Sequence, residues 1–417
     1  MSTKEQYDVI VIGGGPSGMM AAGRAAECGR RVLLIEKNKD LGKKLSITGG
    51  GRCNIFNVEE DEHKLLENYG DAAKFLYSAF SQHGMKDSLH FFEEKGLPIV
   101  VEARKRAFPE SQNAEDVTRL MKRYVTGNHV ELKTGTKVLG FKIDGEKIIG
   151  VETNNGILTA ESFVLATGGS SHTDTGSTGE GITWLKKIGH TVHPSSPNIV
   201  PLTVLEEWVK ALSGTSLSFM KITFGSNLTK ATGRFSRLGK ILFTHFGVSG
   251  PLILNAAHDV EKLLTNGPVE ATIDMYPDTD MGVLQNRVLE IFNTHKNKTL
   301  KNILKEFVPV GMSEAVAVQF PLELQETKVH SVSKLERRTI VNLLKAMPLT
   351  ITGTMGMDWA VTSDGGVDLK EVDTKTMRSK LYSNLYVTGD VLHINRPSGG
   401  FSLQLCWTTG YVAGSHV

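Results

Sequence analysis

A glycine-rich loop and a carboxylate near the start of the chain have the spacing of a dinucleotide-binding site. Gly13, Gly15 and Gly18 fit the pattern G-x-G-x-x-G, with Pro16-Ser17 between them, and Glu36 follows the next apolar run. In such a loop the glycines allow a tight turn, close approach of a pyrophosphate and close helix–strand packing. The carboxylate accepts hydrogen bonds from a ribose hydroxyl and repels a 2′-phosphate. The pattern therefore predicts a dinucleotide site, and the alternative is a glycine-rich turn in an ordinary α/β unit.

Two further glycine-rich segments have the composition of ligand-binding loops. Gly49-Gly50-Gly51 is followed by Arg52-Cys53-Asn54, which favours close approach of backbone to a ligand. The segment 175–181 gathers glycine, serine and threonine before a helix, a composition suited to an anion or a close backbone contact. We expect both segments to be loops of a binding site.

The last part of the chain carries a third signal. An apolar run ends in Gly389-Asp390, and a glycine pair with Phe401 and Ser402 then precedes a predicted helix. An acid at the carboxyl end of a parallel strand lies where open α/β sheets bind ligands. There Asp390 can accept a hydrogen bond from a ribityl or ribose hydroxyl.

The elements that must position these residues are short apolar strands. Tyr7–Ile12, Arg31–Ile35 and the run ending at Leu165 are continuous apolar runs, typical of parallel strands buried on both faces. A further strand is predicted over Val130–Phe141, with the turn Asp144-Gly145 after it.

The two ends of the chain can share one site only if its middle is an insertion. We predict an α/β nucleotide-binding domain formed by residues 1–192 and 352–417. Residues 193–351 would form an inserted β-rich domain, with a helical subdomain at about 280–345. A long insertion costs little, because loop-closure entropy grows only as the logarithm of length.

Bulk composition is that of a soluble globular protein. The 417 residues are 40% hydrophobic and 22% charged, with a formal net charge of +2, which gives no global case for nucleic acid or a membrane. No apolar run is long enough to span a bilayer, and no signal peptide is visible. Three scattered cysteines fit a reducing, cytoplasmic setting without a metal cluster.

Taken together, these segments resemble the HI0933-like flavoprotein family, within the glutathione-reductase-like FAD superfamily. The resemblance rests on GKKLSITGGGRCN at 42–54, ATGGSS at 166–171, GSTGEG at 176–181, FTHFGVSGP at 243–251, the run at 364–381 and SGGFSLQ at 398–404. The family includes NAD(FAD)-utilizing dehydrogenases, aminoacetone oxidases and bile-acid reductases. The resemblance implies FAD, a Rossmann-like domain, a β-barrel-like insert and a helical subdomain. The chain departs from the family pattern where His393 replaces a second acid after Asp390.

The motifs and the resemblance together give the residues expected to contact FAD. They are Gly13, Gly15, Pro16, Ser17, Gly18, Glu36, Lys37, Lys43, Ser46, Gly49, Gly50, Gly51, Arg52, Cys53, Asn54, Val138, Ala166, Thr167, Gly168, Gly169, Asp390, Gly400, Phe401, Ser402 and Leu403.

Catalytic residues are harder to choose. Arg52 could stabilise negative charge on a reduced ring, or it could simply pair with an acid. His245 and His393 are candidate acids or bases, and most histidines in a chain of this kind are structural. The basic residues Lys221, Lys230, Arg234, Arg237 and Lys240 lie in a stretch without acids. That stretch suits RNA, NADPH or another phosphorylated ligand, although a solvated face of a β-domain is the preferred interpretation.

The sequence therefore predicts an FAD-dependent oxidoreductase acting on a small organic substrate. Only one dinucleotide motif is visible, so either NAD(P)H visits the flavin as a transient co-substrate or electrons pass to oxygen or another acceptor. The alternatives are an RNA-modifying flavoprotein and a non-catalytic flavin-binding sensor. Neither the substrate nor the oligomeric state follows from the sequence.

Overall fold

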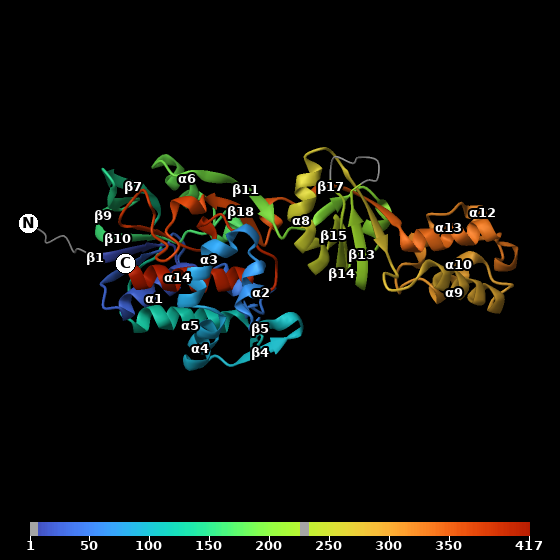
Figure 1. Ribbon diagram of the computed structural model, residues 1–417, viewed down its shortest axis with the longest axis horizontal. Coiled ribbons are helices and arrows are strands. Elements are labelled where there is room, and N and C mark those ends of the chain that lie inside the picture. Colours follow the sequence, from blue (N-terminus) through green and yellow to red (C-terminus); the bar gives the residue numbers. More distant parts are fainter. Residues whose placement is uncertain (1–6, 226–232) are drawn as a thin grey trace, which may run out of the picture. The chain divides into compact units, whose positions relative to one another are not determined.

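The chain divides into two compact units. The computed structural model describes residues 7–225 and 233–417. Unit 1 combines the chain up to Asn198 with Ala360–Val417, and unit 2 is the intervening Ile199–Trp359. In Figure 1 the blue helix α1 (Pro16–Glu27) and the red helix α14 (Phe401–His416) lie together in unit 1. The two ends of the sequence thus build one unit, with the middle inserted.

A parallel sheet forms the centre of unit 1. Its strand order is β19-β10-β1-β2-β6, and its strands are β1 (Tyr7–Ile12), β2 (Val32–Ile35), β6 (Glu131–Lys133), β10 (Ala160–Leu165) and β19 (Leu385–Val387). Ile12 pairs with both Leu165 and Ile35, and Leu165 pairs with Val387. The residues that follow these strands therefore meet at one edge, where open α/β sheets bind ligands.

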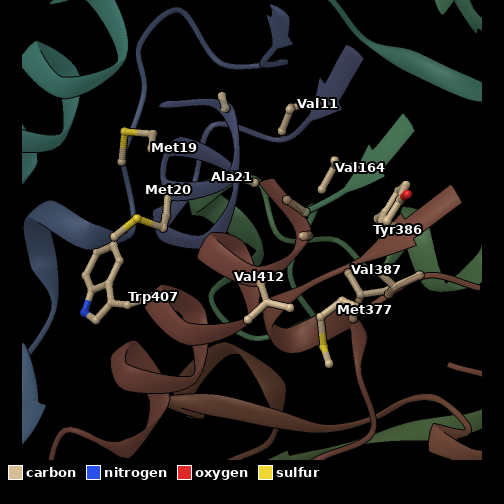
Figure 2. Packing of buried hydrophobic residues seen from close by; sticks show 14 of the residues in the cluster. Val11, Met19, Met20, Ala21, Val164, Met377, Tyr386, Val387, Trp407 and Val412 are labelled. Atoms are coloured by element: carbon tan, nitrogen blue, oxygen red, sulfur yellow. The ribbon is translucent and has the colours of Figure 1, made fainter. Parts of the chain in front are cut away.

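The core of unit 1 lies around this sheet. Figure 2 shows Val11 of β1, Val164 of β10 and Val387 of β19 in one cluster with Met20 of α1 and Trp407 of α14. All of these side chains are fully buried. The continuous apolar runs of the sequence are explained by burial of the strands on both faces.

Smaller elements complete unit 1. One antiparallel sheet has the order β3-β5-β4 and another has the order β7-β8-β9. Their strands are β3 (Phe56–Asn57), β4 (Ile99–Glu102), β5 (Arg106–Pro109), β7 (Val138–Asp144), β8 (Lys147–Thr153) and β9 (Gly156–Leu158). The remaining α-helices of unit 1 are α2 (Glu62–Glu67), α3 (Ala73–Gln82), α4 (Met85–Glu94), α5 (Ala114–Gly127) and α6 (Glu180–Lys187).

The strand predicted over 130–141 is two strands in different sheets. β6 joins the parallel sheet and β7 begins at Val138. Between them the backbone N–H of Gly135 donates to the Asn38 carbonyl, and that of Thr136 donates to the Glu36 carbonyl. This turn brings residues 136–138 to the ligand edge of the sheet.

Unit 2 contains a closed barrel of antiparallel pairs with helices beyond it. The barrel order is β12-β15-β14-β13-β16-β17, with β12 (Leu202–Val204), β13 (Ser216–Phe224), β14 (Phe235–Thr244), β15 (Gly247–Ser249), β16 (Val269–Asp274) and β17 (Met347–Thr354). The α-helices are α7 (Glu207–Ala211), α8 (Pro251–Leu264), α9 (Met281–Thr294), α10 (Leu300–Ile303), α11 (Ser313–Ala317), α12 (Leu322–Gln325) and α13 (Lys334–Lys345). The fold class is therefore α/β, with a Rossmann-like domain interrupted by a barrel that carries helices.

The unit boundaries lie later than the predicted 193 and 351. Strand β11 (Val192–Asn198) pairs with β18 (Thr362–Val367) and so belongs to unit 1. Pro194 and Pro197 lie inside β11, and prolines are tolerated at the edges of sheets. At the other boundary, β17 pairs with β12 and β16, so the barrel extends past residue 351. Strand pairing, which composition does not reveal, sets both limits.

Candidate cofactor site

A cavity of about 380 Å³ lies at the carboxyl ends of the parallel strands in unit 1. The size is within the range of small-molecule and cofactor sites. The cavity joins three loops that are far apart in the sequence, those after β1, β10 and β19. Among the residues that line it are Gly13 and Asp390, which the sequence required to meet at one ligand.

The structure places most of the predicted contact residues in the cavity wall. Those that line it are Gly13, Gly15, Pro16, Ser17, Glu36, Lys37, Lys43, Gly49, Gly50, Val138, Ala166, Thr167, Gly168, Asp390, Ser402 and Leu403. Those that it does not bring into the wall are Gly18, Ser46, Gly51, Arg52, Cys53, Asn54, Gly169, Gly400 and Phe401.

The glycine loop has the geometry that its pattern predicts. Gly13 has a φ of +107°, and a Cβ there would lie 2.5 Å from the Ala166 carbonyl oxygen. A Cβ on Gly18 would lie 1.9 Å from the Gly13 carbonyl oxygen, so this glycine serves packing rather than ligand contact. At Gly15, by contrast, no atom beyond the adjoining backbone lies within 4 Å of the position that a Cβ would take. Space for a pyrophosphate is therefore open beside Gly15, at the start of α1, where free N–H groups favour anions.

The carboxylate of Glu36 is held in place by hydrogen bonds at the cavity. One of its carboxylate oxygens accepts a hydrogen bond of 2.7 Å from the Gly14 N–H. The other accepts bonds of 2.8 Å from the backbone and side chain of Asn38. The first of these oxygens has accepted only one bond and can accept another, so the fixed carboxylate retains capacity for a ribose hydroxyl.

Two hydroxyl groups at the cavity lack partners. The Oγ1 atoms of Thr167 and Thr362 are buried, and neither forms a hydrogen bond within the described residues. Buried polar groups are usually satisfied, and an orphaned group calls for an explanation such as a ligand. The open space beside Gly15 and the carboxylate of Glu36, both in the cavity wall, fit a bound dinucleotide.

Asp390, which lines the cavity, forms an ion pair with a buried arginine. Its carboxylate contacts the guanidinium group of Arg396, which is only 3% exposed. Arg396 also donates to the Ser402 hydroxyl at 3.0 Å and to the Ile394 carbonyl at 2.7 Å. The ion pair therefore connects the loop after β19 to the first turn of α14, both of which line the cavity. Sequence reasoning passed over Arg396, although it lies six residues after Asp390.

In the loop at 46–54, residues 47–50 line the cavity, whereas Arg52, Cys53 and Asn54 do not. With the Asn54 amide oriented to satisfy its hydrogen bonds, its oxygen accepts from the Gly400 N–H at 3.0 Å. Cys53 is fully buried, and this burial raises the pKa of its thiol, which does not favour a redox role. Arg52 contacts Glu102 and Gln112 and lies over the Phe108 ring. Arg52 therefore pairs with an acid, which is one of the two roles that the sequence suggested, the other being stabilisation of charge on a reduced ring.

The segment at 172–180 is part of the site, although none of its residues was among those expected to contact FAD. The wall also includes His172, Thr175, Gly176, Ser177, Thr178 and Glu180. Lys37 forms an ion pair of 2.8 Å with Glu180, and Lys137 lies 2.9 Å from the same carboxylate. Burial tends to raise the pKa of Glu180, but hydrogen bonds from both lysines lower it overall. The glycine, serine and threonine content of this segment was the signal that identified it.

Other residues of the wall had no local signal. Thr136 and Trp184 line the cavity, as do Val361, Thr362 and Cys406. Val361 and Thr362 reach the wall because β18, which begins at Thr362, pairs with β11. No sequence pattern predicted this pairing. Burial raises the pKa of the Cys406 thiol to about 12, so this cysteine is protonated at neutral pH.

The two histidine candidates have different positions. His245 belongs to unit 2, in the turn between β14 and β15, and does not line the cavity of unit 1. His393 lies outside the cavity wall and stacks on His193, with 4.1 Å between ring centroids. Its Nδ1 lies 3.3 Å from an oxygen of Asp364, while Nε2 of His193 lies 3.3 Å from Asp368. His393 thus belongs to a cluster of two imidazoles and two carboxylates.

The stability of this cluster should depend on pH. The Asp364 carboxylate raises the pKa of His393 above its ordinary value, with burial opposing the shift. A raised folded-state pKa stabilises the fold below about pH 6.5, and that contribution disappears as pH rises through the folded-state value. His393→Gln should therefore lower the free energy of unfolding at pH 5.5, by about 1 kcal/mol or less for a partly exposed pair, and change it less at pH 9. Urea unfolding at both pH values measures this, and an equal loss at both would contradict it.

The described residues contain neither a membrane-spanning helix nor a metal-binding cluster. Within residues 7–225 and 233–417, no helix combines the length and the apolar character that crossing a membrane requires. In the same ranges, no group of histidine, cysteine, aspartate and glutamate side chains is arranged to hold a metal ion.

Comparison with known proteins identifies the family. The family model described as HI0933-like protein Rossmann domain matches residues 7–416. A 3-dehydro-bile acid delta(4,6)-reductase of Clostridium scindens is 28% identical over 413 residues, which cover 97% of each chain. A ribosomal RNA dihydrouridine synthase of Escherichia coli is 28% identical over 410 residues, covering 98% of this chain and 97% of that protein.

Solved structures show the same fold. A 3-ketosteroid delta1-dehydrogenase from Sterolibacterium denitrificans superposes with a TM-score of 0.55 at 14% identity and covers 99% of both chains. An open-conformation flavocytochrome c3 fumarate reductase gives 0.52 at 15% identity, covering 100% of this chain and 78% of the other. Because the family match extends over nearly the whole sequence, the chain belongs to the HI0933-like family, and it is an FAD-dependent oxidoreductase.

Proposed function

We propose that this enzyme reduces a ring carbon–carbon double bond conjugated with a carbonyl group, with NAD(P)H as electron donor. The proposal is supported by two relatives matched over nearly their whole length. One name describes reduction of double bonds in a 3-dehydro-bile acid, and the other describes formation of dihydrouridine, in which a ring double bond of uridine is reduced. Both names describe reduction of a ring carbon–carbon double bond, and the proposal for this chain rests on that shared reaction rather than on either substrate.

The single observation that supports the cofactor half of the proposal is the cavity at the ends of β1, β10 and β19. FAD bound there supplies hydride transfer, while the protein supplies binding, orientation and electrostatics. The free N–H groups at the start of α1 would bind the pyrophosphate, and Glu36 would orient a ribose.

The electron donor is proposed to bind transiently. The described part of the chain has one parallel sheet, and its glycine loop and Glu36 belong to the FAD cavity. A permanently built second dinucleotide domain is therefore not seen in residues 7–225 and 233–417. NAD(P)H would deliver its hydride and leave before the substrate binds. Oxygen as an electron acceptor is the alternative outcome of the test below.

A uridine in ribosomal RNA is the second candidate substrate. Lys221, Arg234, Arg237 and Lys240 are exposed on β13 and on or beside β14, which favours contact with phosphates. Arg237, however, forms an ion pair of 2.6 Å with Asp259, so part of this charge is neutralised. Lys230, the remaining residue of the basic stretch, lies outside the described residues. We therefore place a small cyclic enone first, and this basic face keeps RNA as the second candidate.

Anaerobic stopped-flow spectroscopy tests the proposal in two half-reactions. NADH or NADPH should bleach the flavin, and a 3-keto-4-ene steroid should then restore its absorbance at least about tenfold faster than the matched saturated 3-ketone. Reoxidation by a ribosomal RNA fragment but not by the enone would favour the second candidate. Reoxidation by oxygen alone would refute the double-bond reductase assignment.

A further inference from the structure

Lys44 places an ammonium group in the wall of the cofactor cavity without a carboxylate beside it. The residue precedes the short helix η1 (Leu45–Ile47) and is partly buried. Its Nζ donates to the Ser171 carbonyl oxygen at 2.7 Å and lies 3.3 Å from the Ser171 hydroxyl. Within residues 7–225 and 233–417, no carboxylate oxygen lies within 4.0 Å of Nζ. An ammonium group has three donors, so at least one N–H lacks an acceptor in this part of the chain.

The ammonium groups of the other two lysines that line the cavity have different surroundings from that of Lys44. Lys37 forms its ion pair with Glu180, and the exposed Lys43 donates to the Asp174 carbonyl. The nearby carboxylate of Asp390 is already occupied by Arg396. Positive charge at Lys44 is therefore not balanced by a direct contact with a protein carboxylate.

Partial removal of this charge from water has a cost. Burial lowers the pKa of Lys44, and the charge of Asp390 opposes the shift without cancelling it. A partly desolvated charge is stabilised when an opposite charge and hydrogen-bond acceptors approach it. An anion entering the cavity would therefore gain from Lys44, and it would supply the missing acceptor.

We propose that Lys44 pairs with an anionic group of bound FAD. This rests on FAD occupying the cavity, and it assigns a binding role to a residue that was not among those expected to contact FAD. Two groups of the cofactor have the required charge, the diphosphate and the ring after it gains electrons. Pairing with the diphosphate would strengthen binding in both redox states, whereas pairing with the reduced ring would raise the midpoint potential.

Lys44→Met separates a cofactor-pairing role from a structural one. The variant keeps an unbranched side chain that is one atom shorter and removes its charge. The full-length protein is deflavinated and titrated with FAD, and the midpoint potential is measured by equilibration with a reference dye. We expect the Kd for FAD to rise about tenfold or more, or the potential to fall by about 30 mV, which corresponds to tenfold for a two-electron couple. A raised Kd with unchanged potential indicates the diphosphate, and a lowered potential with unchanged Kd indicates the ring.

Stability of the deflavinated protein provides the second readout. Removing a partly buried charge that has no carboxylate partner should leave the melting temperature of deflavinated Lys44→Met unchanged or higher. A purely structural role predicts a lower melting temperature with wild-type Kd and potential, and that result would overturn the proposal. The same conclusion follows if all three quantities match wild type.

Two further variants complete the design. Lys44→Arg retains the charge and should remain closer to wild type than Lys44→Met in Kd and potential. Lys39→Met makes the same charge change at an exposed lysine that does not line the cavity, and it should change neither quantity. If Lys44→Met does not fold, Lys44→Gln replaces it and the same outcomes apply. Because wild type is titrated in parallel, failure of wild type to bind FAD would be distinguishable from failure of the Lys44 assignment.

Discussion

Replacing Gly15 with valine should remove FAD from the protein and leave the polypeptide folded. Gly15 lines the cavity, and no atom beyond the adjoining backbone lies within 4 Å of the position that its Cβ would take. Its φ of −78° is accessible to any L-residue, so the substitution introduces no backbone strain. The added isopropyl group would occupy space needed by the pyrophosphate. We expect the affinity for FAD to fall about 100-fold, equivalent to roughly 3 kcal/mol, with little change in far-UV circular dichroism.

The measurement is the flavin absorbance that remains with the purified variant, together with FAD titration of the deflavinated protein. Gly15→Ala is the graded control and should lose less affinity, because its side chain extends less far. A yellow Gly15→Val protein with wild-type affinity would show that the pyrophosphate does not bind beside Gly15.

Gly400 is not an equivalent position for this test, although its motif suggests that it borders the flavin. A Cβ on Gly400 would lie 2.3 Å from the backbone carbon of Phe56, and its φ is +101°. Gly400→Val would therefore strain the backbone and displace Phe56 with or without a cofactor. Loss of FAD from that variant would not locate the flavin, whereas loss from Gly15→Val would.

The sequence predicted the backbone of the site better than its side chains. G-x-G-x-x-G, Ala166–Gly168 and Asp390 each follow an apolar strand directly, so local pattern and parallel pairing are enough to bring them to one edge. The wall residues Thr362 and Lys44 depend instead on tertiary packing. Thr362 reaches the site because β18 pairs with β11. Lys44 stands out only once the structure shows that one of its N–H groups has no acceptor.

Side-chain partners explain the remaining differences. Arg52 follows a glycine loop, which suggested a contact with the flavin ring, but the structure places Glu102 and Gln112 beside it. Those partners lie at least 50 positions later in the sequence, beyond the reach of any local motif. The barrel was similarly implied by the family resemblance, while its limits came from the pairing of β12, β16 and β17.

The ion pair of Asp390 and Arg396 should have the largest effect on stability. Arg396 is almost completely buried, so Asp390→Asn would leave a guanidinium charge without its carboxylate in a poorly solvated position. Removing one partner of a buried ion pair costs about 3 kcal/mol or more. We expect a loss of this size in the free energy of unfolding, measured by urea unfolding of deflavinated protein so that FAD binding does not contribute.

Two comparisons separate loss of the pair from loss of the Asp390 side chain. Arg396→Met in the Asp390→Asn background removes the stranded charge and should recover part of the stability, because an apolar replacement of a buried pair is often tolerated. Glu102→Gln breaks the half-exposed pair with Arg52 and should cost about 1 kcal/mol or less. If Asp390→Asn costs no more than Glu102→Gln, the Asp390–Arg396 pair does not stabilise the fold. The role of Asp390 would then be confined to the ligand in the cavity that it lines.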